Sequence, residues 1–325
     1  MSMSKSMSMS FALASRVAAS RAARCSMSRA HARERMGFKR TTTHDVKAHV
    51  DESETIITSV ENALVKRMTK LRESKKFRDD ERAVVVASST VMRECFSIRP
   101  GGRGQKKTIA RILVLSENAK VPKEIEAMRI VRASERVLKK CAGVENADAL
   151  DVVGEFERPL VMTSNAFEEK YARERKKVRV LALEGVQDPG NLGTLARTAV
   201  AFGWDVLALL PSTCDPFNDK AMRAARGATF RIDLVQFESF DELKKSCEAL
   251  GMDMYAAEPN AATSADAESA RDERRVCLVL GTEGRGLSDK ALVGCKPVAV
   301  PMSGDMESLN VGIAGGVLMY LMRAR

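Results

Sequence analysis

Apolar runs alternate with glycine-rich turns and helical stretches over the C-terminal half of the chain. Four runs have the length and composition of buried strands, at residues 178–183, 206–210, 276–280 and 298–300. Strands that alternate with helices predict a parallel sheet, whose ligand site lies at the carboxyl ends of the strands. Residues 178–325 are therefore expected to form an α/β domain with a site at those ends.

A second, smaller pattern of apolar runs precedes it, within residues 54–165. It predicts a small α/β domain, joined to the larger one by a charged helical linker at 166–177. The polar stretch 259–272 is expected to be a mobile surface loop. The predicted strands of the small domain lie at 83–87, 112–115 and 129–131, and its predicted helices at 63–71, 89–95, 123–128 and 134–141.

The positive charge of the chain is concentrated at one end. The formal net charge of +10 by itself suggests a polyanionic partner. Residues 1–50 hold ten lysines and arginines and two acids, a net of +8, so the remainder carries only about +2. A basic segment rich in Ser, Met and Ala is typical of a transit peptide for a mitochondrion or chloroplast; a disordered basic tail that touches RNA is the alternative.

Outside that leader, the composition excludes several classes of site. All three histidines (His31, His44 and His49) fall within it, which excludes a histidine triad, histidine-ligated zinc and a histidine base from the body. The seven cysteines contain no C-x-x-C pair and indicate incidental thiols in a reducing compartment. No stretch approaches the roughly 18 apolar residues that span a bilayer. We expect neither a metal nor a membrane anchor.

The first glycine-rich turn, at 184–199, contains two candidate site residues. The run from Asp188 to Gly190 predicts a tight turn, after which Asn191 is expected to cap the next helix. Arg197 follows in a helix that is otherwise small and apolar. Arginine is unusual in such a helix, which makes Arg197 a functional candidate; a surface or ion-paired arginine is the alternative.

The other two turns add further candidates. Gly281 and the glycines after it let the backbone approach a ligand closely, and Glu283 could bind a hydroxyl group or a cation. As an isolated glycine-rich loop this is a weak signal. Ser308 and Asn310 crowd the start of the last helix, where capping explains one of them but not both. Small residues at 312–316 allow that helix to pack closely against a partner subunit or another segment.

Together the three turns resemble the SpoU (TrmH-like) branch of the SPOUT RNA methyltransferases. The family's motifs N-x-G-x-x-x-R-T-A, G-x-E-G-x-G-L/M and I/V-P-M-x-G-x-x-x-S-L-N-V occur here in order. Residues 56–94 look, more weakly, like the family's accessory RNA-binding domain of ribosomal-protein L30e type. The matching motif residues are Asn191, Gly193, Arg197, Thr198 and Ala199; Gly281, Glu283, Gly284, Gly286 and Leu287; and Val300, Pro301, Met302, Gly304, Ser308, Leu309, Asn310 and Val311.

The resemblance implies a fold and an assembly. The C-terminal domain would be a SPOUT α/β domain with a trefoil knot, an exception to the rule against knots. The domain at 54–165 would be an L30e-like domain that binds the RNA substrate. The chain would form a homodimer with the cofactor pocket near the interface.

The resemblance also implies an activity, the transfer of a methyl group from S-adenosylmethionine to a ribose 2'-hydroxyl. The RNA would be ribosomal or transfer RNA, with ribosomal RNA slightly favoured. Arg197 would act at the hydroxyl, with Asn191, Glu283, Ser308 and Asn310 shaping the site. The cofactor would lie in loops at Gly281, Val300, Met302 and Leu309.

The chemistry leaves the role of Arg197 open. Methyl transfer needs donor and acceptor aligned at about 3 Å and a proton removed from the hydroxyl. A guanidinium group normally stays protonated, so Arg197 either acts as a base in a special microenvironment or orients a phosphate and stabilises the developing alkoxide.

Two other classes of protein are alternatives. A Rossmann-type methyltransferase or dehydrogenase is disfavoured by the spacing of Gly185, Gly190 and Gly193. A catalytically silent RNA-binding or ribosome-associated protein with the same fold is disfavoured by the intact set of polar motif residues.

Overall fold

The computed structural model describes residues 51–96, 109–122, 125–145, 150–259, 266–282, 284–302 and 308–324. The predicted leader at 1–50 lies outside these residues, and so does Glu283. The two domains expected from the sequence are each built on a sheet of their own.

The N-terminal domain contains a five-stranded sheet in which the third strand runs parallel to one neighbour and antiparallel to the other. The sequence predicted three of these strands, while β1 and β7 were missed. A short strand, β5 (Glu126–Ala127), stands where a helix was predicted at 123–128. In spatial order the strands are β1 (Asp51–Ile57), β6 (Arg129–Ala133), β4 (Ile112–Ser116), β7 (Val152–Glu157) and β2 (Ala83–Ala87).

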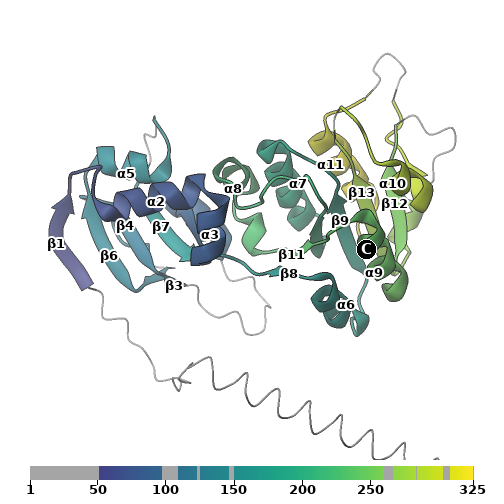
Figure 1. The fold of residues 1–325 in the computed structure, drawn as a ribbon, viewed down its shortest axis with the longest axis horizontal. Coiled ribbons are helices and arrows are strands. Elements are labelled where there is room, and N and C mark those ends of the chain that lie inside the picture. Colours follow the sequence, from purple (N-terminus) through teal and green to yellow (C-terminus); the bar gives the residue numbers. More distant parts are fainter. Residues whose placement is uncertain are drawn as a thin grey trace, which may run out of the picture. The chain divides into compact units, whose positions relative to one another are not determined.

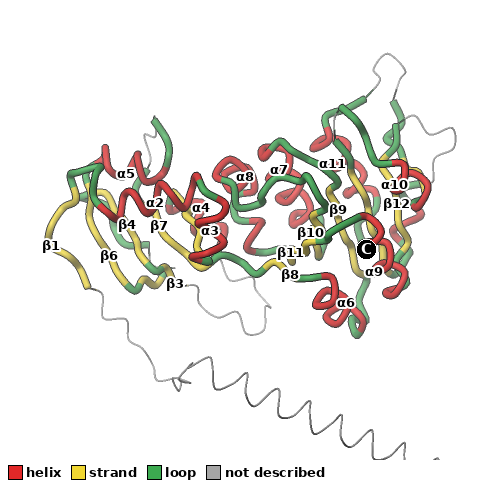
Figure 2. The backbone as a smooth tube through the Cα atoms, viewed as in Figure 1, coloured by secondary structure: helices red, strands yellow, loops and turns green. Residues whose placement is uncertain are grey.

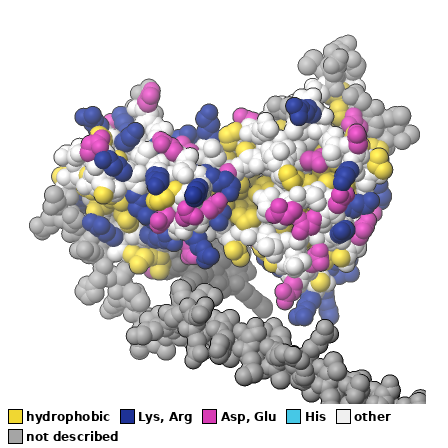
Figure 3. All heavy atoms as spheres, in the orientation of Figure 1, with side chains coloured by type: hydrophobic (Ala, Val, Ile, Leu, Met, Phe, Trp, Pro, Cys, Tyr) yellow, Lys and Arg dark blue, Asp and Glu magenta, His cyan; other side chains and the backbone are white. Residues whose placement is uncertain are grey.

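Helices α2 (Ala63–Glu73) and α5 (Glu135–Ala142) pack together over one face of this sheet (Figure 1). α2 begins at Asn62, whose side chain accepts a hydrogen bond from the Leu64 amide at 2.9 Å. Its apolar face is buried in a core shared with α5 and the sheet, whereas its other face is basic. On the face drawn in Figure 3, basic and acidic side chains are interspersed, as the small net charge outside the leader predicts.

The C-terminal domain contains a seven-stranded sheet in which every pairing is parallel. This confirms the predicted fold class; the trefoil knot stays a prediction. In spatial order the strands are β14 (Lys296–Val298), β12 (Asp253–Ala257), β13 (Arg275–Leu280), β9 (Val178–Leu183), β10 (Val206–Leu209), β11 (Asp233–Gln236) and β8 (Val161–Met162).

Helices cover both faces of this sheet (Figure 2). Successive side chains of β9 enter opposite cores, with Leu181 and Leu183 in one and Val180 and Ala182 in the other. The first core also contains α7 (Pro189–Ala201), α8 (Asp219–Ala225) and α11 (Val311–Leu321). The second also contains α6 (Ser164–Ala172), α9 (Phe240–Leu250) and α10 (Asp289–Gly294).

The boundary between the domains differs from the predicted one. β8, assigned to the first domain by the sequence, pairs with β11 of the C-terminal sheet. Most of the predicted linker at 166–177 is helix α6, which buries Phe167 and Tyr171 in the second core. The charges on its exposed face concealed this apolar pair, so the segment belongs to the C-terminal domain.

A buried arginine ties the C-terminal domain together. Arg179 on β9 is fully buried, and burial lowers the pKa of its guanidinium. It donates hydrogen bonds to the carbonyl oxygens of Met322 at 2.8 Å and of Ala270 and Arg271 at 3.1 Å each. The second half of the predicted mobile loop at 259–272 therefore packs against the domain, with Ala270 buried.

Replacing Arg179 with methionine is expected to lower the free energy of unfolding by about 2–4 kcal/mol, because several buried carbonyl groups lose their donor. The single tryptophan, Trp204, is buried and reports unfolding by its fluorescence in a urea titration. As a control, Arg173→Met removes an exposed arginine and should change stability by less than about 0.5 kcal/mol. Equal stability losses in the two variants would contradict the expectation.

Candidate functional site

The predicted site lies where the turns after β9, β13 and β14 meet the first turns of α7 and α11. β9 and β13 are adjacent and in register, with Leu183 opposite Leu280. The Glu184 amide then donates to the Leu280 carbonyl at 2.9 Å. Two of the glycine-rich turns therefore start side by side, as expected for a parallel sheet.

The structure brings Asn191 and Asn310 together. The Asn310 side-chain amide donates to the Asn191 oxygen at 3.3 Å, and the Asn310 oxygen caps α11 by accepting from the Gly312 amide at 2.9 Å. Capping thus explains Asn310, while Ser308 lines a neighbouring cavity. The expectation that Asn191 caps α7 was wrong. Asp188 is the cap and accepts from the Asn191 amide at 2.8 Å, which leaves the Asn191 side chain available for Asn310.

Arg197 lies on the exposed side of α7. Within the described residues its side chain has neither a hydrogen bond nor an ion pair, so no structural ion pair accounts for it there. It lines neither of the two cavities at this end of the sheet. α7 packs closely on α11, where a Cβ on Gly315 would lie 2.6 Å from Leu195 Cδ2. The position leaves Arg197 available to a ligand approaching from outside the chain.

All four residues predicted to hold the cofactor line one cavity of about 370 Å³. Its wall is formed by the ends of β12, β13 and β14 and by one side of α11. The sequence missed the contribution of Ala257 and Glu258, because β12 itself was not predicted. The lining includes Gly281, Val300, Met302 and Leu309, with Ser308, Glu258, Leu280, Thr282, Arg285 and Leu318.

The cavity fits a nucleoside-sized ligand such as S-adenosylmethionine. Its volume lies within the range of small-molecule sites, and apolar side chains adjoin exposed backbone and a few polar groups. Gly281 forms a cradle that admits no side chain, because a Cβ there would lie 2.4 Å from the Gly286 carbonyl oxygen. Thr282 and Gly286 exchange two 3.1 Å backbone hydrogen bonds that hold this turn.

A second cavity of about 530 Å³ adjoins the first and shares Thr282, Gly284, Arg285 and Val311 with it. Its remaining wall comes from the first turn, from Gly185 to Asn191, and from Ser212 after β10. Ser212 was not predicted, because nothing in its local sequence links it to the site. This wall places hydrogen-bonding groups beside Asn191.

Replacing Gly281 with alanine is expected to reduce the affinity for S-adenosylmethionine about ten- to a hundredfold. The new Cβ must displace the turn that lines the cavity, and such overpacking costs about 1–3 kcal/mol. Isothermal titration calorimetry measures the affinity. Gly316→Ala is the control, since a Cβ there meets Thr198 only at the ordinary contact distance of 3.7 Å and Gly316 does not line the cavity, so binding should be nearly unchanged. Similar losses in both variants would show that the cradle is not the cause.

Within the described residues, no cluster of three or more His, Cys, Asp or Glu side chains could hold a metal ion. The same residues include no helix that is both long and apolar enough to cross a membrane.

The chain is similar to known RNA methyltransferases in sequence. Residues 178–320 match the model of the SpoU rRNA Methylase family. The chain is 32% identical to the 23S rRNA (guanosine(2553)-2'-O)-methyltransferase RlmP of Bacillus subtilis over 275 residues, 82% of this chain and 98% of that protein. It is 30% identical to the 23S rRNA (guanosine-2'-O-)-methyltransferase RlmB of Xanthomonas campestris, over 59% of this chain and 82% of that one.

Solved structures share the fold. The rRNA methyltransferase from Sinorhizobium meliloti, crystallised with AdoMet bound, superposes with a TM-score of 0.67 at 24% identity and covers 84% of this chain and 97% of its own. The SpoU methyltransferase AviRb from Streptomyces viridochromogenes superposes with a TM-score of 0.65 at 19% identity, over 80% of this chain and 96% of its own. The likeness extends over both domains.

Proposed function

This chain belongs to the SpoU rRNA methylase family, and from that premise we propose that it methylates a ribose 2'-hydroxyl of ribosomal RNA with S-adenosylmethionine. One observation carries the proposal. The cradle at Gly281 opens into a nucleoside-sized cavity directly beside the Asn191–Asn310 pair.

The residues of the site have separate roles in methyl transfer. S-adenosylmethionine, when bound, supplies an electrophilic methyl group, so the chain has to align the acceptor and handle a proton. The Asn310 amide fixes the Asn191 side chain across two helix starts. Arg197 has no partner within the described residues and can contact a phosphate or stabilise charge developing on the 2'-oxygen. Glu283 completes the predicted set and lies outside the described residues.

Methylation of isolated ribosomal RNA tests the proposal. The protein is incubated with methyl-labelled S-adenosylmethionine and unmodified ribosomal RNA, and the labelled nucleotide is mapped. We expect label on a single ribose, and none when that nucleotide is replaced by its 2'-deoxy form. Label on a base, or label that persists on the deoxy substrate, would overturn the assignment. RNA binding without transfer would favour the catalytically silent alternative.

A homodimer is part of the proposal, and its support is an apolar stripe on α11. Ile313, Val317 and Tyr320 are 59%, 36% and 47% exposed and recur at helical spacing. Tyr320 also packs at an angle against Phe202, which follows α7. Since Arg197 does not line the cofactor cavity of its own chain, a second copy across this stripe would supply it.

The accessory domain and the leader complete the proposal. The N-terminal α/β domain would bind the RNA substrate in the manner of ribosomal protein L30e. The leader at 1–50 would direct import into a mitochondrion or chloroplast, which import of a fused reporter into isolated organelles tests.

A further inference from the structure

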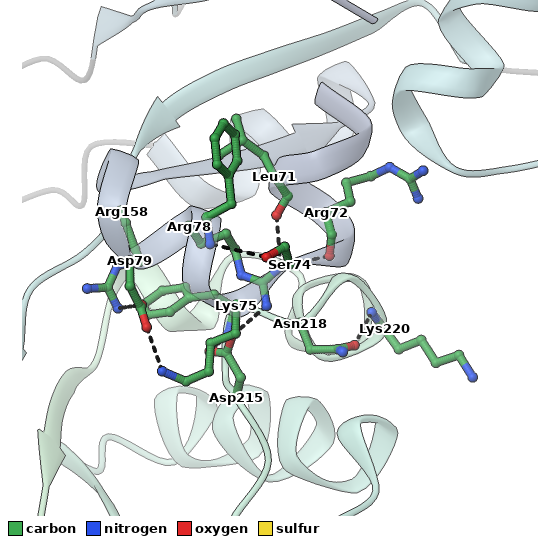
Figure 4. A network of polar contacts seen from close by, with 12 residues as sticks. Leu71, Arg72, Ser74, Lys75, Arg78, Asp79, Arg158, Asp215, Asn218 and Lys220 are labelled. Carbon is green, nitrogen blue, oxygen red and sulfur yellow. Dashed lines mark hydrogen bonds and ion pairs between the residues drawn. The ribbon is translucent and has the colours of Figure 1, made fainter. Parts of the chain in front are cut away.

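A buried ion pair joins the N-terminal domain to the C-terminal domain (Figure 4). Arg78, on α3 (Lys75–Glu81), is 3% exposed and donates from Nη2 to Asp215 Oδ2 at 2.6 Å. Its Nη1 donates to the carbonyl oxygens of Leu71 at 2.8 Å and Arg72 at 2.7 Å, at the end of α2. One guanidinium therefore fastens the end of α2 to the loop at 210–218, between β10 and α8.

The 210–218 loop is bonded in turn to the first glycine-rich turn. Thr213 Oγ1 accepts from the Gly185 amide at 3.1 Å and donates to the Leu183 carbonyl at 2.8 Å. The Cys214 amide donates to the Val186 carbonyl at 2.9 Å. This turn ends at Asp188, the cap of α7, so the loop is one hydrogen bond away from the turn that leads into α7, the helix that carries Asn191.

The conformation of Ser212 shows that the loop is held by its surroundings. Ser212 has a φ of 64°, in the left-handed region, which costs a non-glycine residue about 1–2 kcal/mol. Such a conformation persists only where neighbouring contacts fix it. Here it places Ser212 in the wall of the second cavity, beside Asn191.

The helix after the loop extends the same support. α8 packs so closely on α7 that a Cβ on Gly193 would lie 2.4 Å from the Ala221 carbonyl oxygen. A small shift of α8 therefore moves α7, which carries both Asn191 and Arg197. The position of the 210–218 loop sets the position of α8.

We propose that Arg78 is a positioning residue for methyl transfer: through Asp215 it holds the 210–218 loop and α8, and thereby the second cavity beside Asn191, the acceptor side of the site where the ribose would bind. The inference rests on the proposed function. The N-terminal domain is then a structural part of the site, in addition to any role in binding RNA. No residue of the loop lines the cofactor cavity, so Arg78 acts on the acceptor side alone.

The test compares Arg78→Met and Asp215→Asn with wild type. We expect kcat to fall about tenfold or more, because a misplacement of about 1 Å can cost a hundredfold in rate. The KM for S-adenosylmethionine should stay within about twofold. Arg78→Lys should not restore the rate, since one ammonium group cannot bridge two carbonyls and a carboxylate as the planar guanidinium does.

Glu94→Gln is the matched control. Glu94 forms another arginine–carboxylate pair between the same domains, with bonds of 2.9 Å and 2.7 Å to Arg226, which caps the far end of α8 and does not touch the 210–218 loop. We expect this variant to keep its kcat within about twofold. If it lost as much kcat as Arg78→Met, the effect would be one of domain docking and the proposal would fall.

Hydrogen exchange provides a readout that does not depend on activity. In Arg78→Met the amides of Gly185 and Cys214 should exchange faster, while in Glu94→Gln they should not. Unchanged exchange would overturn the proposal even if the wild type were inactive, whereas inactivity alone would count against the proposed function. Trp204 fluorescence reports whether Arg78→Met folds. If it does not fold, Asp215→Asn is used instead for both the kcat and the hydrogen-exchange measurement.

Discussion

Replacing Arg197 with alanine is expected to lower the single-turnover rate of methyl transfer about 10²- to 10³-fold, the usual cost of losing one group that stabilises developing charge. The affinity for S-adenosylmethionine should remain within about twofold, because Arg197 does not line the cofactor cavity. The rate is measured by quenched-flow transfer of labelled methyl to ribosomal RNA, and the affinity by calorimetry.

Two further variants separate the possible roles of Arg197. Arg197→Lys keeps the positive charge but loses the planar fork, so partial activity would indicate a charge role and none would indicate bidentate contact. Arg173→Ala removes an exposed arginine from the end of α6 and should leave the rate unchanged. Undiminished transfer by Arg197→Ala would remove Arg197 from the mechanism.

Replacing Ile313 with aspartate is expected to separate the proposed dimer and abolish most of the activity. A carboxylate at the centre of an apolar interface loses its water without gaining a partner, which costs at least about 2 kcal/mol per copy. Sedimentation should then report the mass of a single chain, 35.6 kDa. Val293→Asp changes another exposed apolar residue, on α10, and should leave both mass and activity unaltered. An active Ile313→Asp monomer would contradict the shared site.

Mixing two inactive variants tests whether the site is shared between copies. In a dimer of one Arg197→Ala chain and one Gly281→Val chain, a shared site pairs the intact Arg197 of one copy with the intact cavity of the other. Random reassortment should then restore about a quarter of wild-type activity, from one working site in half of the dimers. A site contained within one chain would restore none.

Much of the cofactor side could be predicted from sequence, because its residues are neighbours along the chain. Gly281 follows a continuous apolar run and Val300 ends another, so the rule for parallel strands predicts a site at these ends, and the family resemblance implied that these two residues hold the cofactor together with Met302 and Leu309. β11 and β12 were missed, since each is short and begins with a charged residue, Asp233 and Asp253 respectively.

The acceptor side was harder to predict because the residues that hold it in place are distant from it in the sequence. Arg78 and Asp215 are 137 residues apart, and neither belongs to a motif. Ser212 carries no local signal for its left-handed backbone. The choice between Asp188 and Asn191 as the helix cap depends on a hydrogen bond that composition does not encode, since both residue types cap helices well.

The hydrogen bonds of Arg179 also bear on how the chain folds. Met322, one of its acceptors, lies 143 residues further along the chain, so the contact closes a long loop and forms only when the intervening segments are ordered. Until then an uncompensated guanidinium sits on the central strand β9 and opposes burial of that strand. Collapse of the C-terminal domain before α11 docks is therefore disfavoured, and native contacts of high sequence separation make folding slow. The same buried charge that stabilises the complete domain therefore destabilises a partly folded one.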